Sequence, residues 1–252
     1  MNLIGAIATV RESVVAVLRY RQIQPQMKIK KTGKVQPAKY NLGWGSGFNV
    51  VADRYVVTAF HVLNGGQQGQ PRNPQDKFVV FVVPGNGNPA YHFPVIGFPV
   101  ERPDVDLAVI EIGPCVTQGI HLPALPVSFS GQPDGERVLT LGFPQPLVDG
   151  INIDPQGNYL GGQYFLKSHA NEGILSAQYL DGQSQMYEFN VGWYNGESGG
   201  PVVRIDDPLA AISIMQQYRN ITASHGTVVG PHRGRVLSAI QQDLSRLGAT
   251  IV

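Results

Sequence analysis

The chain of 252 residues is cut into short apolar runs by closely spaced glycines and prolines, and this spacing limits what it can fold into. It contains 30 Gly and 19 Pro, and only 15% of its residues are charged. Runs of β-branched and aromatic residues bounded by Gly, Pro, Asn or Asp are typical of strands. The pattern predicts an all-β protein of the sandwich or barrel type. We expect strands at residues 14–20, 45–52, 55–59, 77–83, 95–98, 107–112, 137–141, 163–169, 172–177, 186–189, 201–205, 210–216 and 226–230.

A single helix is indicated by periodicity, close to the C-terminus. Val236, Ile240, Leu244 and Leu247 recur at helical spacing, and a glycine follows them where helices commonly end. The strands before this helix fall into two nearly equal sets on either side of the proline-containing segment 121–135. Counting strands on each side therefore predicts two β-barrels.

We place both barrels in one domain, residues 1–252. Residues 11–120 are expected to form the first barrel, residues 124–231 the second, and residues 232–248 the closing helix.

Composition and charge narrow the class of protein further. The net charge of +1 gives no electrostatic argument for binding nucleic acid or a membrane. The single cysteine, Cys115, rules out an internal disulfide framework, favours a reducing compartment, and is expected to be a small buried or rim residue. The first apolar run is short and is cut by Arg11 and Glu12, which argues against a signal peptide, and no apolar run reaches the ~18 residues of a membrane span. We therefore expect a cytoplasmic protein with no metal and no cofactor.

The basic segment, residues 19–39, is unusual in composition. It contains seven Lys and Arg residues and no acidic residue: Arg19, Arg21, Lys28, Lys30, Lys31, Lys34 and Lys39. A solvated loop or β-ribbon between two strands explains this composition. A docking loop for an acidic regulatory partner explains it as well, and both interpretations stay open at this point.

The stretch GWYNGESGGPVV, residues 192–203, sets Ser198 among glycines directly before an apolar strand. Glycines cluster in ordinary turns because glycine adopts positive φ without steric cost. A reactive hydroxyl also needs a tight turn whose backbone N–H groups can point at one position, which small residues permit. The two interpretations are separated by whether the chain also supplies a base and a group that orients the base.

The chain offers one histidine and one aspartate in suitable positions. His61, in VVTAFHVLNGG, follows an apolar strand at a turn, whereas the other five histidines lie in polar or proline-adjacent contexts. Asp106, in PDVDLAVIEI, stands at the start of a strongly apolar strand. We expect its carboxylate to be partly buried and to need a partner such as an imidazole N–H. Asp104, two residues earlier, is expected to be an exposed turn residue.

The segments TAFHV, DVDLAVIEI and GESGGPVV, in the order His, Asp, Ser, resemble the chymotrypsin-like serine proteases. The greatest similarity is to the bacterial HtrA/Deg branch, through GSGFNVVADRYVVTAFHV before the histidine and LTLGFPQP, ANEGILSA and GWYNGESGGPVV after it. The resemblance implies two six-stranded antiparallel β-barrels with the active site between them. The PDZ domain that often follows in this branch is expected to be absent.

The resemblance also implies a role for each matching residue. Ser198 would be the nucleophile, His61 the general base and Asp106 the group that orients the imidazole. The backbone N–H groups of Gly196 and Ser198 would form the oxyanion hole.

Substrate-binding residues are implied by the same resemblance. They are Gly192, Trp193 and Gly226 around the primary pocket, and Ile214, Met215 and Gln216 along a strand to which substrate backbone would pair. We expect an apolar or small side chain in this pocket, with an acidic one as the alternative because His225 is close in sequence.

Two residues depart from the family pattern. Glu197 stands where the digestive enzymes have Asp and the HtrA branch usually has Asn, so it either pairs with a basic residue or faces solvent. Phe60 replaces the small or polar residue usual before the histidine, and we expect it to pack in the first barrel.

We expect a monomeric serine endopeptidase that acts on protein or peptide substrates through an acyl-enzyme. We expect its activity to be controlled by a regulatory partner. The alternative is a protease-like binding module without turnover. A third possibility joins the two: a latent enzyme whose serine turn is ordered by its partner.

Overall fold

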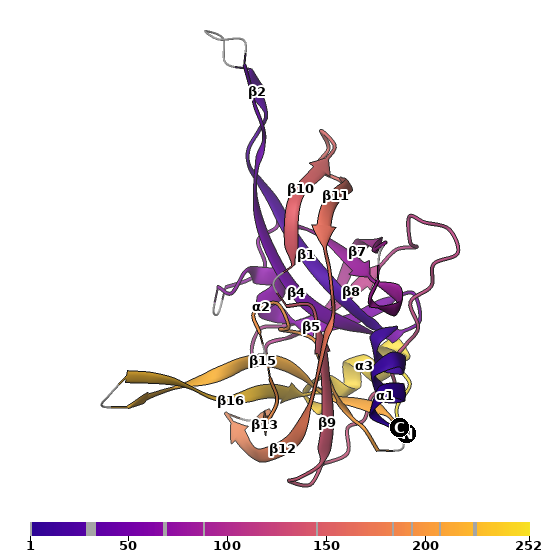
Figure 1. Ribbon diagram of the computed structural model, residues 1–252, viewed down its shortest axis with the longest axis vertical. Coiled ribbons are helices and arrows are strands. Elements are labelled where there is room, and N and C mark those ends of the chain that lie inside the picture. Colours follow the sequence, from indigo (N-terminus) through magenta and orange to yellow (C-terminus); the bar gives the residue numbers. More distant parts are fainter. Residues whose placement is uncertain are drawn as a thin grey trace.

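The computed structural model consists of two closed β-barrels of six antiparallel strands each, which confirms the predicted fold (Figure 1). The structure describes residues 2–28, 34–67, 70–87, 89–144, 146–182, 184–192, 194–206, 208–223 and 226–252. None of the described helices is long and apolar enough to cross a lipid bilayer.

The first barrel has the strand order β1-β4-β5-β8-β7-β6. Its strands are β1 (Val14–Gln24), β4 (Lys39–Val51), β5 (Tyr55–Ala59), β6 (Lys77–Val82), β7 (Tyr91–Arg102) and β8 (Leu107–Ile112). Strand β5 is buried along its whole length, and the hydroxyl of its one polar residue without an aromatic ring, Thr58, donates to the Ser46 oxygen at 2.6 Å. The predicted site residue His61 follows directly after the buried end of β5.

The second barrel has the order β12-β13-β16-β15-β14-β9. Its strands are β9 (Arg137–Gly142), β12 (His169–Asp181), β13 (Ser184–Phe189), β14 (Pro201–Arg204), β15 (Ala210–Ala223) and β16 (Gly226–Val236). The interior holds aromatic rings such as Tyr187 and Phe189, which meet edge to face at 6.0 Å. A continuous apolar core runs from the first barrel into this one and includes Phe48, Leu141 and Val203.

Several strands are longer than the sequence predicted, and they form hairpins that project from the barrels (Figure 1). Strands β1 and β4 continue into a ribbon that also carries β2 (Met27–Lys28) and β3 (Val35–Gln36). The basic segment is therefore a β-ribbon in its described part. A second hairpin, β10 (Leu147–Ile153) and β11 (Tyr159–Phe165), leaves the second barrel after β9.

The helical parts differ from expectation in two places. The N-terminus forms helix α1 (Leu3–Arg11), begun by the Asn2 side chain, which accepts the Gly5 N–H at 2.8 Å. The C-terminal helix begins later than the predicted residue 232, because β16 stays paired to its end. A 3₁₀ turn (Leu237–Ile240) follows β16, and helix α3 (Gln241–Leu247) follows the turn. A 3₁₀ turn (Pro84–Asn86) and helix α2 (Phe60–Asn64) complete the helical elements of the described residues.

The connection between the barrels is fastened to the first barrel. The Asn49 side chain donates to the backbone oxygens of Leu122 and Pro123, at 2.8 and 3.1 Å, and the Leu125 N–H donates to the Asn49 oxygen at 2.8 Å. Asn49 is fully buried on β4, so these bonds have no competition from solvent. The proline-containing segment is therefore a fixed joint.

Candidate active site

His61 lies in the first turn of α2, directly after β5. Its Nδ1 is 2.8 Å from Asp106 Oδ2, and its backbone N–H donates to Asp106 Oδ1 at 2.8 Å. Phe60 beside it is buried in the first barrel, as predicted. One carboxylate thus contacts both the ring and the backbone of the histidine, which fixes the ring's orientation and leaves Nε2 as the nitrogen that can exchange a proton.

Asp106 reaches His61 from an unusual backbone conformation. Its φ of 55° is in the left-handed region, which costs a non-glycine residue on the order of 1–3 kcal/mol. Its carbonyl accepts the Phe60 N–H at 3.2 Å, so three hydrogen bonds to α2 offset that cost. The side chain is 30% exposed, which agrees with the expected partial burial.

Asp104 is an exposed turn residue, as expected. Its carboxylate pairs with the Arg102 guanidinium at 2.6 Å, and this hydrogen bond lowers the pKa of Asp104 below its usual value. The neighbouring carboxylates at positions 104 and 106 therefore have separate partners.

Ser198 is buried at the interface of the barrels, but its hydroxyl does not meet the imidazole in this structure. The Oγ donates to the Gln216 backbone oxygen at 3.3 Å, and in the described part of the chain no hydrogen bond joins it to His61. The structure thus brings His61 and Asp106 into contact and leaves the serine turned toward β15.

The serine turn, residues 194–198, is built by glycine and by short-range hydrogen bonds. Gly196 has a φ of 101°, a conformation that side chains rarely adopt. The Glu197 N–H donates to the Tyr194 oxygen at 3.1 Å, which closes the turn. Among the described residues, the N–H groups of Gly196 and Ser198 donate to no acceptor. Within that part of the chain, neither predicted oxyanion donor is used by another group.

Gly199 is required by close contact as well as by its φ of 86°. A Cβ at this position would collide with the Ser46 oxygen and the Thr58 hydroxyl of the first barrel. The Gly199 N–H donates to the Met215 oxygen at 2.7 Å. The glycine lets the serine turn sit directly on the first barrel.

Glu197 takes neither of the two positions that the sequence suggested. It is 3% exposed and forms no ion pair among the described residues. Its Oε2 accepts the Tyr194 N–H at 2.8 Å, and its Oε1 is buried without a hydrogen-bond partner in the described structure. Burial raises the pKa of Glu197 from 4.5 to about 7.

Ser46 is a site residue that sequence reasoning missed. It is fully buried on β4, and its backbone N–H donates to the Ser198 oxygen at 2.7 Å. Its hydroxyl donates to the Gly196 oxygen at 2.7 Å and accepts the Phe143 N–H at 2.8 Å. The GSGF stretch of the sequence was the available signal, but nothing local shows that this serine reaches a turn 150 residues away.

The predicted substrate-binding residues are only partly gathered at the site. Gly192 is exposed beside the serine turn, and Trp193 and the alternative selector His225 lie outside the described residues. Gly226 pairs with Ala223 at the far tip of the β15–β16 hairpin (Figure 1), so the structure does not place it at a pocket near Ser198.

Residues 214–216, predicted to pair with substrate backbone, lie on β15, where part of their backbone already has hydrogen-bond partners. Ile214 pairs with Pro201 of β14 on one side and with β16 on the other. The backbone N–H and oxygen of Met215 are bonded to Gly200 and Gly199, at 2.9 and 2.7 Å. Strand β14 does not cover the backbone from Gln216 onward, and the Gln216 oxygen accepts the Ser198 hydroxyl in this structure.

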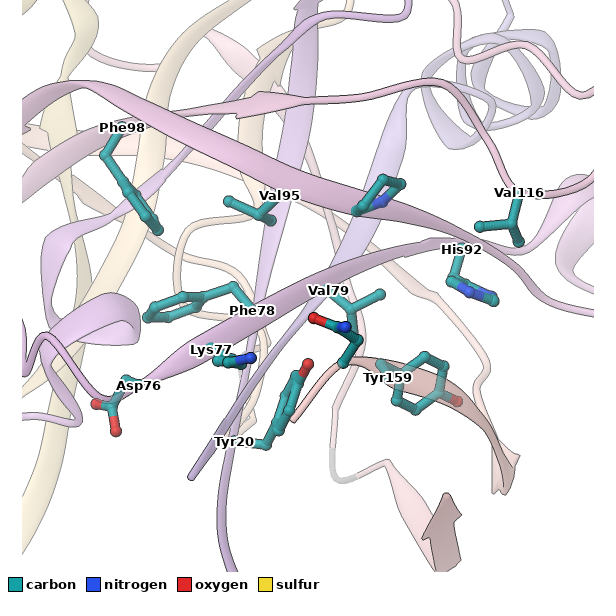
Figure 2. A pocket seen from close by; sticks show the side chains of 12 residues that line it. Tyr20, Asp76, Lys77, Phe78, Val79, His92, Val95, Phe98, Val116 and Tyr159 are labelled. Atoms are coloured by element: carbon teal, nitrogen blue, oxygen red, sulfur yellow. The ribbon is translucent and has the colours of Figure 1, made fainter. Parts of the chain in front are cut away.

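A cavity of about 400 Å³ lies elsewhere, between the first barrel and the β10–β11 hairpin (Figure 2). It is lined by aromatic rings, including Tyr20, Phe78 and Tyr159, and contains none of the predicted site residues. Lys77 Nζ donates to the Gln156 oxygen at 2.7 Å and the Tyr20 hydroxyl to the Gly157 oxygen at 3.2 Å. Its polar groups thus fasten the hairpin to the barrel.

Two closed barrels of six antiparallel strands each define the fold class of the chymotrypsin-like peptidases. Residues 45–212, more than half of the chain, match the trypsin-like peptidase domain, so the chain belongs to the trypsin-like peptidase family. A crystal structure of Deg5 has a similar fold, with a TM-score of 0.56 and 18% identity, covering 95% of this chain and 90% of Deg5. A comparison with curated protein sequences gives no match.

Proposed function

We propose that this protein is a serine endopeptidase that cleaves peptide bonds through an acyl-enzyme at Ser198. The observation that carries the proposal is the double contact of Asp106 with the ring and the backbone of His61. A carboxylate held in this way keeps the imidazole in one tautomer and stabilises the imidazolium formed when the histidine takes a proton.

In the proposed reaction, the Ser198 hydroxyl transfers its proton to His61 Nε2 as its oxygen attacks the carbonyl carbon of the substrate. His61 then gives the proton to the leaving amine, and water hydrolyses the acyl-enzyme by the same route in reverse. The N–H groups of Gly196 and Ser198, which donate to no acceptor among the described residues, would stabilise the negative oxygen of the tetrahedral intermediate.

The serine must first leave its present partner. Because the Ser198 hydroxyl donates to the Gln216 oxygen, turnover requires that it exchange this bond for one to His61. We infer that this is a resting arrangement, and that substrate or a regulatory partner converts it to one in which the Ser198 hydroxyl donates to His61. Apo structures of enzymes commonly hold catalytic hydrogen bonds in such loose arrangements.

The substrate would bind as an extended strand along the edge of β15 beyond Met215. Strand β14 starts at Pro201, so it covers β15 only up to Ile214, and the backbone from Gln216 onward has no β14 partner. Pairing of this kind recognises the substrate backbone with little choice among side chains. An unfolded protein segment is the class of substrate that fits.

The second candidate function is a binding module without turnover. The position of the Ser198 hydroxyl, on Gln216 rather than His61, is the observation that favours it. Both candidates predict binding of extended peptides, and only the first predicts a nucleophilic serine.

Labelling with a fluorophosphonate probe, followed by peptide mapping, separates the two. We expect one adduct per chain at Ser198, lost in Ser198→Ala and in His61→Ala. His121→Ala is the matched control, because His121 also contacts an aspartate, Asp53, at 2.8 Å, but lies exposed on the surface. A folded wild-type protein without an adduct, alone and with unfolded casein added, contradicts the proposed activity.

A further inference from the structure

The carboxyl of Glu197 closes the serine turn through a hydrogen bond within the turn. Its Oε2 accepts the Tyr194 N–H at 2.8 Å, while its own N–H donates to the Tyr194 oxygen at 3.1 Å. Residues 194 and 197 are thus joined twice, once through the backbone and once through the side chain. The loop between them contains Gly196, one of the two proposed oxyanion donors.

The side chain of Glu197 has little freedom to leave this position. It is 3% exposed, and its stem lies against Gly142, where a Cβ would come within 2.9 Å of the Glu197 Cα and Cβ. The glycine at the end of β9 leaves the space that the glutamate occupies.

Ser46 of the first barrel holds the same turn through two further hydrogen bonds. Its hydroxyl donates to the Gly196 oxygen at 2.7 Å, and its backbone N–H donates to the Ser198 oxygen at 2.7 Å. These two bonds come from β4 of the first barrel, whereas Glu197 acts within the second half of the chain. The peptide between Gly196 and Glu197 is therefore held on both sides, its oxygen by the Ser46 hydroxyl and its N–H by the Tyr194 oxygen.

We propose that Glu197 and Ser46 are positioning residues, which together hold the Gly196 N–H in the orientation that an oxyanion requires. This inference rests on the proposed peptidase function and names what prepares its site. Neither residue touches the substrate in this scheme.

The proposal also assigns a protonation state to the competent turn. The titratable groups around the turn are Tyr194 itself, His169 on β12 (ring 6.2 Å from that of Tyr194) and the His61–Asp106 pair of the first barrel. Within the described structure, no titratable side-chain group of these residues is hydrogen-bonded to or ion-paired with the Glu197 carboxyl, which Tyr194 contacts through its backbone N–H. A buried carboxylate without a cation would repel the developing oxyanion, whereas a neutral carboxyl still accepts the Tyr194 N–H. The neutral form is therefore the competent one.

Two substitutions of Glu197 test the inference, with hydrolysis of fluorescein-labelled casein as the readout. Glu197→Gln keeps an acceptor for the Tyr194 N–H and is always neutral. We expect it to retain kcat within about threefold of wild type near pH 6, and to stay active above pH 7, where wild type declines. Glu197→Ala removes the acceptor, and we expect kcat to fall about a hundredfold with little change in KM, as when an oxyanion donor is lost. Ser46→Ala should lower kcat in the same way.

Glu111→Gln, a change of a partly exposed glutamate that pairs with Arg54, is the matched control and should leave kcat unchanged at every pH. Wild-type kcat in Glu197→Ala, or identical pH profiles for wild type and Glu197→Gln, would overturn the inference.

Hydrogen exchange of the Tyr194 amide separates this inference from the proposed function. We expect protection of that amide in wild type and Glu197→Gln, and its loss in Glu197→Ala. If wild type neither reacts with the fluorophosphonate nor cleaves casein, the peptidase proposal fails, while the exchange experiment still shows whether Glu197 holds the turn. Equal exchange in all three proteins excludes the positioning role by itself.

Discussion

A single buried carboxyl distinguishes the site of this chain at the residue scale. Glu197 is removed from water, and among the described residues no cation lies beside it and the Tyr194 N–H is the one group that donates to its carboxyl. Desolvation of this kind favours the protonated form. The residue next to the proposed nucleophile therefore binds a proton more tightly in the folded protein than in the unfolded chain, which makes stability depend on pH.

We predict the sign of this dependence from the pKa of Glu197, which folding raises from 4.5 to about 7. The stability that the tighter proton binding adds is fully present below pH 4.5. It is lost as the pH rises from 4.5 through 7, because over that interval the folded state holds a proton that the unfolded chain has released. Relative to wild type, Glu197→Gln should gain roughly 2 kcal/mol in free energy of unfolding between pH 5 and pH 8. Urea unfolding of both proteins at several pH values measures it. Parallel stability curves would mean that the carboxyl is ionised in the folded state.

The burial of Glu197 also shows what the sequence leaves undetermined at this scale. The positions of His61 and Asp106 could be predicted, because each adjoins a strand whose apolar residues fix the backbone. The partner of Glu197 could not be predicted, because its burial depends on Gly142, far away in the chain. The rotamer of Ser198 was equally hidden, since it depends on where the Gln216 carbonyl lies.

Strand β9 matters to the site at the element scale, because its last residue forms one wall behind the serine turn. Gly142 has ordinary backbone angles, so its role is the space that it leaves for Glu197. The strand pairs with β12 along its whole length and with β14 at residues 138–140, so it cannot shift easily to accommodate a larger residue. The turn would have to move instead.

Gly142→Ala should therefore disturb the turn more than the fold. Overpacking of this kind costs about 1–3 kcal/mol, and we expect fluorophosphonate labelling of Ser198 to slow at least tenfold. Gly131→Ala is the control, because a Cβ there meets nothing within 4 Å and its φ is not positive. Thermal unfolding and labelling rates measure the two effects. An unchanged labelling rate in a destabilised Gly142→Ala protein would show that the turn tolerates the displacement.

Elements were predictable where local pattern decides them. The central strands follow from apolar runs, and the presence and the end of the C-terminal helix follow from apolar periodicity and the glycine at 248. Helix α1 was not predicted, because its short run contains Gly5 and its formation depends on the Asn2 cap and on burial of Ala6 and Val10. The ribbon beyond β1 could be anticipated only as one of two interpretations of the basic segment, because its polar sequence carries no periodic signal and its pairing comes from β4.

The whole molecule assembles the candidate site across two barrels, and Gln216 is a buried link between them. It is 4% exposed on β15, and its Nε2 donates to the backbone oxygens of Val105 and Asp106, at 3.1 and 3.2 Å. Its own oxygen accepts the Ser198 hydroxyl. One residue of the second barrel thus contacts both Asp106 of the first barrel and Ser198, and so fixes their relative positions.

Gln216→Met tests this registration, since Met has a similar volume and no donor. Two buried carbonyl groups lose this donor, so we expect a loss of about 1–3 kcal/mol in the free energy of unfolding. Labelling of Ser198 should slow about tenfold, because the His61–Asp106 pair is no longer tied to the strand beside the serine. Gln132→Met is the matched control: Gln132 is equally buried, but its side chain donates to the Ser130 oxygen within the second half of the chain. It should destabilise the protein without slowing the labelling. Equal slowing in both variants would mean that labelling follows overall stability, and that the barrels hold the site together through their shared apolar core alone.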